Sequence, residues 1–355
     1  MKKSLRHLVA AFGAAILAAG ALQTQASHVQ GSELTYTCIA PNMYVVNLKL
    51  YRDCSGATAP TTASLVLKSQ GCNNGRSQAM TKVGGNSIGN LYCPQLGAPT
   101  CIITGNPNYE EVVLTTTVTF SAAETQCADW LLSWSLCCRP SSANIQNAQS
   151  YSFYTEAYLN LGNQATGSIN NSSPQFNNIV VPYVNQGQPI ILSSNAIDSD
   201  GDSLVYSLQA PLDQGPVTYS TYNGQGGIMV NPQDSSQFIF LPNGSYTYTP
   251  TFPMPSYTVD WSVPNPVATP SFGFDPQNGS LAFTPSVYQP SPSNQGLNKY
   301  VVVVQVDEFR KIGGIPVKVG TVRRDMFITV VDCGPNQNPV VTAPVANGMA
   351  LTPGT

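Results

Sequence analysis

Three aspartates form the densest acidic motif in the chain. They lie in the sequence DSDGD at 198–202, as Asp198, Asp200 and Asp202. Carboxylates gathered by a flexible glycine loop are ligands for a hard cation, so the motif makes these three residues candidate Ca²⁺ ligands. The motif is not an EF-hand, because Ser203 and Gln209 stand where that loop requires glycine and glutamate.

The same motif has a second interpretation that needs no metal. In a polar turn between strands, aspartate side chains accept hydrogen bonds from the backbone N–H groups of the residues that follow. Both interpretations stay open. If calcium binds, we expect further acidic ligands from Glu156, Asp307 or Glu308.

Few residues in the chain suit catalysis. The two histidines, His7 and His28, both lie near the N-terminus, which argues against a Ser-His-Asp triad or a histidine-rich zinc site. Glu110 and Glu111 are adjacent, and on a strand they point to opposite faces, which suits solvated edge charge better than glycoside hydrolysis. We therefore predict no catalytic residues and a protein that is not an enzyme. Trp261 is the tryptophan that we expect to be exposed and able to stack on a ligand.

The nine cysteines indicate an oxidising compartment. Adjacent side chains on a strand point to opposite faces, so we expect Cys137 and Cys138 to have separate partners, with Cys138 directed inward. Cys333 stands alone near the end of the chain, and we expect it to be free or to pair with another chain. The other eight are candidates for disulfide bonds: Cys38, Cys54, Cys72, Cys93, Cys101, Cys127, Cys137 and Cys138.

The N-terminus has the layout of a secretory signal peptide. A basic start is followed by an apolar run at 8–22 and by small residues up to Ala26, after which we expect cleavage. The run is shorter than the roughly 20 residues of a membrane span, so we expect none in the mature chain. Three of the 15 basic residues lie in this segment, which leaves 12 against 18 acidic residues and a net charge of −6. Only 9% of the chain is charged, against about 25% in typical domains, which excludes a basic nucleic-acid binder.

Alternating apolar and polar residues predict an all-β fold. Strands are expected over 34–38, 44–51, 112–120, 151–161, 204–208, 300–306 and 324–331, with a hairpin turn at 312–316. Short strands with frequent turns are typical of β-sandwich domains, two or more of them in tandem. After the signal peptide (1–26) we expect a β domain stapled by disulfide bonds (27–165) and a second sandwich (166–333). The second sandwich would carry a Pro-rich extended insertion (242–292). A linker or a further module would follow (334–355).

Several of these segments resemble known surface proteins. Residues 26–54, 127–140, 153–160 and 320–333 resemble stretches of large secreted Bacteroidetes proteins associated with gliding motility. The sequences AIDSDGDSLVYSL at 196–208 and FDPQNGSLAFTP at 274–285 are similar to cadherin-like or Ig-like domains. The resemblance implies a seven-stranded type of sandwich with calcium bound at Asp198, Asp200 and Asp202.

Together these features predict an exported, non-catalytic protein of the cell surface with a structural or adhesive role. Its partners would be other surface proteins or glycans, and nucleic acid is not among them. Two alternatives stay open. One is a carbohydrate-binding module that serves a separate enzyme, and the other is a subunit of a surface filament assembled by pairing of strands or sheet edges.

Overall fold

The computed structural model describes residues 29–54, 56–83, 87–88, 109–163, 166–177, 183–213, 215–223, 227–231, 233–241, 245–290, 295–334, 345–346 and 349–350. Most of these residues lie in strands. The helical segments among them are short 3-10 turns, η2 (Glu124–Gln126), η3 (Ala148–Ser150) and η4 (Gln295–Asn298). In these ranges we find no helix of the length and apolar character needed to cross a membrane. The predicted signal peptide (1–26) lies outside the described residues.

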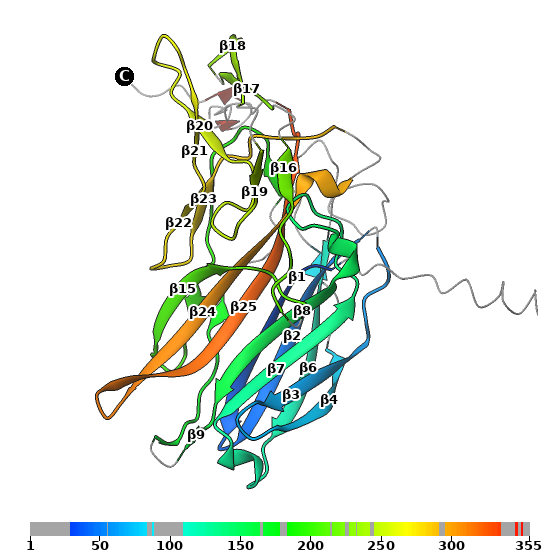
Figure 1. Ribbon diagram of the computed structural model, residues 1–355, viewed down its shortest axis with the longest axis vertical. Helices are drawn as coiled ribbons and strands as arrows, with labels where there is room; N and C mark the ends of the chain where they lie inside the picture. The colour runs from blue at the N-terminus through cyan, green and yellow to red at the C-terminus, as the bar shows by residue number, and fades with distance from the viewer. Residues whose placement is uncertain are drawn as a thin grey trace, which may run out of the picture.

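One twelve-stranded sheet dominates the structure (Figure 1). Its strands follow the order β1-β2-β6-β4-β3-β7-β8-β25-β24-β15. They are β1 (Val29–Ala40), β2 (Met43–Asp53), β3 (Thr62–Ser69), β4 (Asn74–Lys82), β6 (Tyr109–Thr119), β7 (Asp129–Cys137), β8 (Ser152–Asn160), β15 (Ser203–Gln209), β24 (Lys299–Ile312) and β25 (Ile315–Val331). Two short strands complete it: β5 (Ser87–Ile88) pairs with β6, and β12 (Tyr183–Asn185) runs parallel to the end of β25.

The long strand β25 links β1, at one end of this order, to β8. Its residues 320–322 pair with 157–159 of β8, and its residues 324–326 pair with 31–33 of β1. Successive segments of one strand therefore contact both β8 and β1, so the strands from β1 to β8 close through β25, whereas β24 and β15 continue the sheet beyond this closure. The larger of two buried clusters among the described residues contains Val46 and Leu132 together with Val304 and Phe327, and the smaller one is formed by Leu241, Tyr257, Ala268 and Val287.

The sheet and its core continue across residue 166. The boundary predicted there does not coincide with a break, because β25 returns from the C-terminal half of the chain to pair with β1 and β8. The all-β class is confirmed, whereas the division into tandem sandwiches is not.

Local sequence explains the main hairpin. The turn between β24 and β25 consists of Gly313 and Gly314, whose φ angles are 60° and 84°. Only glycine adopts two consecutive positive φ angles at low cost, and such a turn matches the twist of paired strands. The hairpin predicted at 312–316 is therefore confirmed. The other predicted strands also fall on observed ones: β1, β2, β6, β8, β15, β24 and β25.

Short strand pairs lie outside the large sheet, and β16 to β23 lie in the upper part of Figure 1, whereas β9 lies at the lower end. Many of them fall in the Pro-rich segment, where proline removes the backbone donor that a long central strand needs. These pairs are β16 (Thr221–Asn223) with β19 (Ser245–Thr247), β17 (Ile228–Asn231) with β18 (Asp234–Phe240), β20 (Tyr257–Val259) with β21 (Ala268–Pro270), and β23 (Leu281–Phe283) with both β13 (Ile190–Leu192) and β22 (Gly273–Phe274). The remaining pairs are β9 (Gly162–Asn163) with β10 (Gly167–Ser168), β11 (Gln175–Phe176) with β14 (Ala196–Ile197), and β26 (Val345–Ala346) with β27 (Met349–Ala350).

Disulfide bonds link several of these elements. Cys72 and Cys127 are joined with a Cα–Cα distance of 5.9 Å, and Cys54 also takes part in a disulfide bond. Cys93 and Cys101 lie outside the described residues.

Three predictions about cysteines are wrong. Cys137 and Cys138 are bonded to each other, because β7 ends at Cys137 and the alternation of a strand does not extend to Cys138. Cys333 is disulfide-bonded within this chain rather than free or paired with another. Cys38 is a free thiol, and its Sγ donates to the carbonyl oxygen of Ala40 at 3.4 Å.

Candidate functional site

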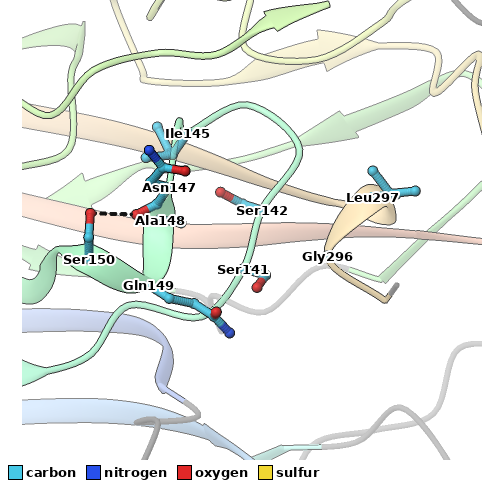
Figure 2. A pocket seen from close by; sticks show the side chains of 9 residues that line it. All are labelled: Ser141, Ser142, Ile145, Asn147, Ala148, Gln149, Ser150, Gly296 and Leu297. Carbon is cyan, nitrogen blue, oxygen red and sulfur yellow. Dashed lines mark hydrogen bonds between the residues drawn. The ribbon is translucent and has the colours of Figure 1, made fainter. Parts of the chain in front are cut away.

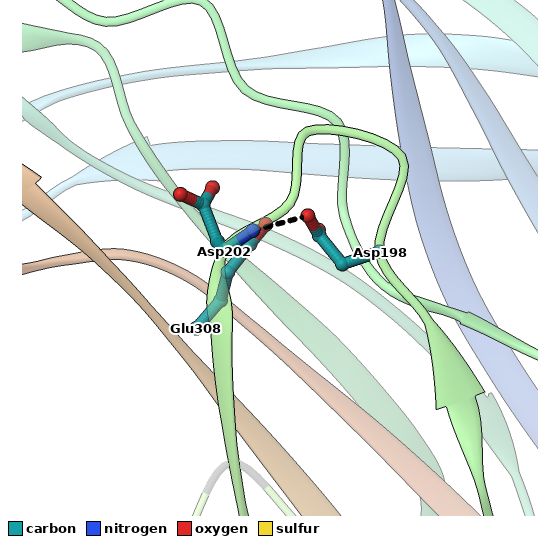
Figure 3. A group of neighbouring side chains, drawn as sticks. All are labelled: Asp198, Asp202 and Glu308. Atoms are coloured by element: carbon teal, nitrogen blue, oxygen red, sulfur yellow. Dashed lines mark hydrogen bonds between the residues drawn. The ribbon is translucent and has the colours of Figure 1, made fainter.

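The DSDGD motif connects β14 to β15, at one edge of the large sheet. Strand β15 pairs with β24, and the register sets Leu204 opposite Glu308. This pairing brings the motif beside a glutamate that is more than 100 residues away in sequence. Figure 3 shows Asp198, Asp202 and Glu308 grouped at the start of β15.

Asp198 shapes the loop that carries the motif. Its Oδ1 accepts hydrogen bonds from the backbone N–H groups of Asp200, at 2.9 Å, and Asp202, at 2.8 Å. Gly201 has a φ of 77°, which lets the chain turn within the loop. The turn-capping interpretation of the motif is therefore confirmed for Asp198.

Asp202 and Asp200 face a positive charge. Nε and Nη2 of Arg310 donate to the Asp202 carboxylate, at 2.8 Å and 2.6 Å. The Asp200 carboxylate lies 3.3 Å from Nη2 of Arg310, and its Oδ2 accepts a hydrogen bond from the backbone N–H of Ser172 at 2.6 Å. The hydrogen bond to Asp202 raises the pKa of Arg310. Arg310 thus neutralises much of the charge on the outer side of the motif.

Glu308 is fully buried, and its surroundings are polar. Its Oε2 accepts a hydrogen bond from Nδ2 of Asn171 at 2.6 Å. Among the described residues, neither Oε1 of Glu308 nor Oδ2 of Asp198 has a hydrogen-bond partner. Burial, and then the Asp198 carboxyl group, raise the pKa of Glu308 to about 10. The raised pKa favours the protonated form of Glu308 when no cation is bound.

A glycine makes room for Glu308. A Cβ at Gly320 of β25 would collide with Oε2 of Glu308 and come within 2.7 Å of the hydroxyl oxygen of Tyr36. The hydroxyl of Tyr36 itself donates to the carbonyl oxygen of Tyr158 at 2.8 Å. Strands β1, β8 and β25 therefore form the inner wall of the site.

The structure changes the predicted set of metal ligands. One oxygen from each of Asp198, Asp202 and Glu308 lies within 4.8 Å of the others, whereas Asp200 is outside this group. Of the additional acidic ligands expected, only Glu308 is in place. Asp307 pairs with Lys318 at 2.7 Å, and Glu156 accepts a hydrogen bond from the Tyr154 hydroxyl at 2.9 Å.

The group has the chemistry of a hard-cation site. Its donors are all carboxylate oxygens, which Ca²⁺ and Mg²⁺ prefer. The two unpartnered oxygens are the second indication, because a buried polar atom normally has a partner. A shared proton between Asp198 and Glu308, or a cation that replaces it, would supply that partner. Asp198, Asp202 and Glu308 are the residues that would hold the ion.

Buried ion pairs are the charged features that sequence reasoning missed. Arg324 is buried and donates to Glu33 of β1 at 2.6 Å. Arg139 binds both carboxylate oxygens of the buried Asp325, at 3.1 Å and 2.7 Å. Glu110, expected as solvated edge charge, is also buried, and it accepts from Nε of Arg52 at 2.6 Å. No local pattern reveals these pairs, since Glu33 and Arg324 are 291 positions apart.

Trp261 lies in a turn between β20 and β21 and is half-buried. Its role in ligand stacking stays a prediction.

Comparisons with known proteins give no identity. No family model matches the chain, and neither the curated proteins nor the solved structures contain a match.

Proposed function

We propose that this chain is an exported, non-catalytic protein of the cell surface with a structural or adhesive role. The observation that carries the proposal is the number of disulfide-bonded cysteines. Cys72 is bonded to Cys127 and Cys137 to Cys138, and Cys54 and Cys333 each take part in a further disulfide bond. Such bonds persist in secreted and extracellular proteins and are rare in the cytosol. The basic and apolar start of the chain, read as a signal peptide, supports the same compartment.

Two buried ion pairs support a structural role. The pairs Arg324–Glu33 and Arg139–Asp325 each connect β25 to a distant part of the chain, at 2.6 Å and 2.7 Å. A guanidinium group that already binds a carboxylate at this distance holds two segments together and cannot readily act on a substrate. These groups therefore favour a rigid binding scaffold over an active site.

Within this proposal, Asp198, Asp202 and Glu308 bind Ca²⁺. The ion would replace the proton of Glu308 and supply a partner for the two free carboxyl oxygens. It would tie the 198–202 loop to β24 and so stiffen one edge of the large sheet. This set of ligands differs from the set predicted from the sequence in one residue, because Glu308 takes the place of Asp200.

The experiment that tests the compartment is expression of the full chain with its own N-terminus in a bacterial host. We expect the chain to leave the cytosol, to begin at Ser27, and to yield the Cys72–Cys127 pair in a non-reducing peptide map, with Cys38 as a free thiol. A chain that stays in the cytosol with nine reduced cysteines would overturn the proposal.

A further inference from the structure

Two cavities lie side by side where the loop before β8 meets η4. One has a volume of about 310 Å³ and the other about 430 Å³, and both have Leu297 of η4 in their walls. Both volumes fall within the range of roughly 300 to 1,000 Å³ that is usual for small-molecule sites. Neither cavity contains Asp198, Asp202 or Glu308, so they are separate from the acidic group.

The smaller cavity is lined by hydroxyl and amide side chains. Figure 2 shows Ser141, Ser142, Asn147 and Gln149 around it, with Leu297 on the opposite wall. The Oγ atom of Ser142 is buried, and no described residue offers it a hydrogen-bond partner. A buried hydroxyl normally has a partner, so Ser142 is the residue of this wall with unused hydrogen-bonding capacity. Because its Oγ atom is covered, a ligand hydroxyl would reach it after a rotation of the serine side chain.

The larger cavity is lined by tyrosine rings. Tyr222, Tyr248 and Tyr300 form part of its wall, and Thr221 and Gln289 add polar groups. The ring centroids of Tyr222 and Tyr248 are 6.1 Å apart, and those of Tyr248 and Tyr300 are 6.2 Å apart, both with edge-to-face contacts. Tyr248 and Tyr300 are buried, whereas Tyr222 is half-buried and is the most accessible of the three rings.

The walls of both cavities are held in place by the backbone. Asn144, between Ser142 and Ile145, is fully buried, and its Nδ2 donates to the carbonyl oxygens of Pro253, at 2.9 Å, and Val301, at 2.8 Å. On the other side, Asn298 of η4 accepts from the backbone N–H of Gln289 and donates to its carbonyl oxygen, each at 2.8 Å. The cavities are therefore preformed, which lowers the entropic cost of binding.

The described lining favours uncharged ligands. The described residues around both cavities include no Asp, Glu, Lys, Arg or His. The ligand that this lining favours is therefore uncharged, offers many hydroxyl groups to serines and amides, and presents an apolar face to an aromatic ring. Sugars combine these three properties, because one face of the ring carries C–H groups while the edges carry hydroxyls.

We propose that the two cavities beside Leu297 bind a neutral carbohydrate, with one sugar unit on Tyr222 and the next at Ser142. The inference rests on the proposed adhesive role and names the ligand class through which it would operate. Trp261 is absent from both linings, so Tyr222 takes the stacking role that we expected for Trp261.

The test measures binding of neutral hexasaccharides of glucose, mannose, xylose and N-acetylglucosamine to the purified full chain. Isothermal titration and saturation-transfer NMR are the readouts, and a hexamer of galacturonate serves as the charged comparison. We expect at least one neutral hexasaccharide to bind and galacturonate not to bind. Tyr222→Ala should weaken binding about tenfold, as expected when an aromatic contact is lost. Ser142→Ala should also weaken binding.

Two variants serve as controls. Tyr222→Phe keeps the ring and should retain binding, and Trp261→Ala alters a tryptophan outside both cavities and should bind as the unmodified chain does. Each variant is checked for an unchanged melting temperature, so that loss of binding is not loss of folding. The proposal is overturned if no neutral saccharide binds, or if Tyr222→Ala and Ser142→Ala leave binding unchanged. A chain that is exported with its disulfides formed yet binds no saccharide would refute this inference alone and leave the proposed surface role standing.

Discussion

Arg310 holds Asp202 through two nitrogen atoms, with Nε 2.8 Å from Oδ1 and Nη2 2.6 Å from Oδ2. Next to this pair, Asp198 and Glu308 each have a carboxyl oxygen without a partner among the described residues. Within one acidic group, an arginine thus neutralises one carboxylate while burial favours the protonated form of another. A cation bound here would replace the proton that the raised pKa favours on Glu308.

Calcium should stabilise the protein through this group. A ligand at about 100 times its dissociation constant adds about 2.7 kcal/mol to the free energy of unfolding, which raises the melting temperature by several degrees. We expect this rise when millimolar Ca²⁺ replaces a chelator in a melting experiment. Equal melting temperatures in calcium and in chelator would refute the metal site.

Two variants separate the ligands of this site. Glu308→Gln removes a ligand while keeping a similar shape, so it should abolish the effect of calcium on melting. Asp200→Asn is the matched control, because Asp200 lies in the motif but outside the group of three ligand atoms. It should retain most of the calcium effect. If Asp200→Asn abolishes the effect and Glu308→Gln does not, the ligand set expected from the sequence is the better one.

Asp129 should make the stability depend on acid pH. Partial burial raises its pKa, but hydrogen bonds from the Ser69 hydroxyl and the Gly71 amide outweigh it and lower the pKa below the usual 3.8. A lowered pKa stabilises the fold above about pH 3.8, and this contribution is lost as the pH falls through the lower value. We expect Asp129→Asn to reduce the free energy of unfolding by about 1–2 kcal/mol at pH 7. In denaturant titrations the difference should shrink by pH 3, and an equal difference at both pH values would contradict this account.

The Cys72–Cys127 bond should contribute strongly to stability. It closes a loop with a sequence separation of 55 residues, and the chain-entropy estimate for such a loop is about 4 kcal/mol. We expect the double variant Cys72→Ala/Cys127→Ala to lose stability of this order in denaturant unfolding. Cys38→Ser is the control, because Cys38 is a free thiol. This substitution should change the free energy of unfolding by less than about 1 kcal/mol. A larger effect of the control than of the double variant would indicate a different pairing.

The Glu33–Arg324 pair tests how β25 closes onto β1. Both side chains are at most 2% exposed, and the guanidinium of Arg324 also lies 3.9 Å from the ring centroid of Phe176. Removing one partner of a buried ion pair takes a counter-charge away from the other and costs about 3–5 kcal/mol. Glu33→Gln should therefore destabilise the fold by this amount. Asp307→Asn, which breaks the more exposed pair with Lys318, should cost less than about 1 kcal/mol. Comparable losses for the two variants would argue against the buried contact.

Local patterns in the sequence account for much of the fold. Alternation of apolar and polar residues predicts β2 and β6, because each strand has one face in the core, as Leu48 and Leu114 show. Two glycines suffice to locate the turn between β24 and β25. The capping role of Asp198 is also local, because its partners lie two and four residues ahead.

The parts that depend on distant pairing could not be predicted. Arg310 joins the DSDGD motif only through the register between β15 and β24, and the same register selects Glu308 from the three additional acidic residues that the sequence offered. The burial of Arg324 depends on the contact of β25 with β1, and periodicity alone places this arginine equally well in solvent. The bond between Cys137 and Cys138 requires the end of β7 at Cys137, and the boundary of a strand is the feature that a sequence pattern defines least well.

The measurement that tests the central claim most directly is labelling of intact bacteria that produce the full chain. A biotin reagent that cannot cross membranes reacts with exposed lysines, and the labelled chain is then identified by mass spectrometry under non-reducing conditions. An exported surface protein should carry the label, begin at Ser27 and contain the Cys72–Cys127 bond. An unlabelled chain, recovered from the cytosol with its cysteines reduced, would contradict the account.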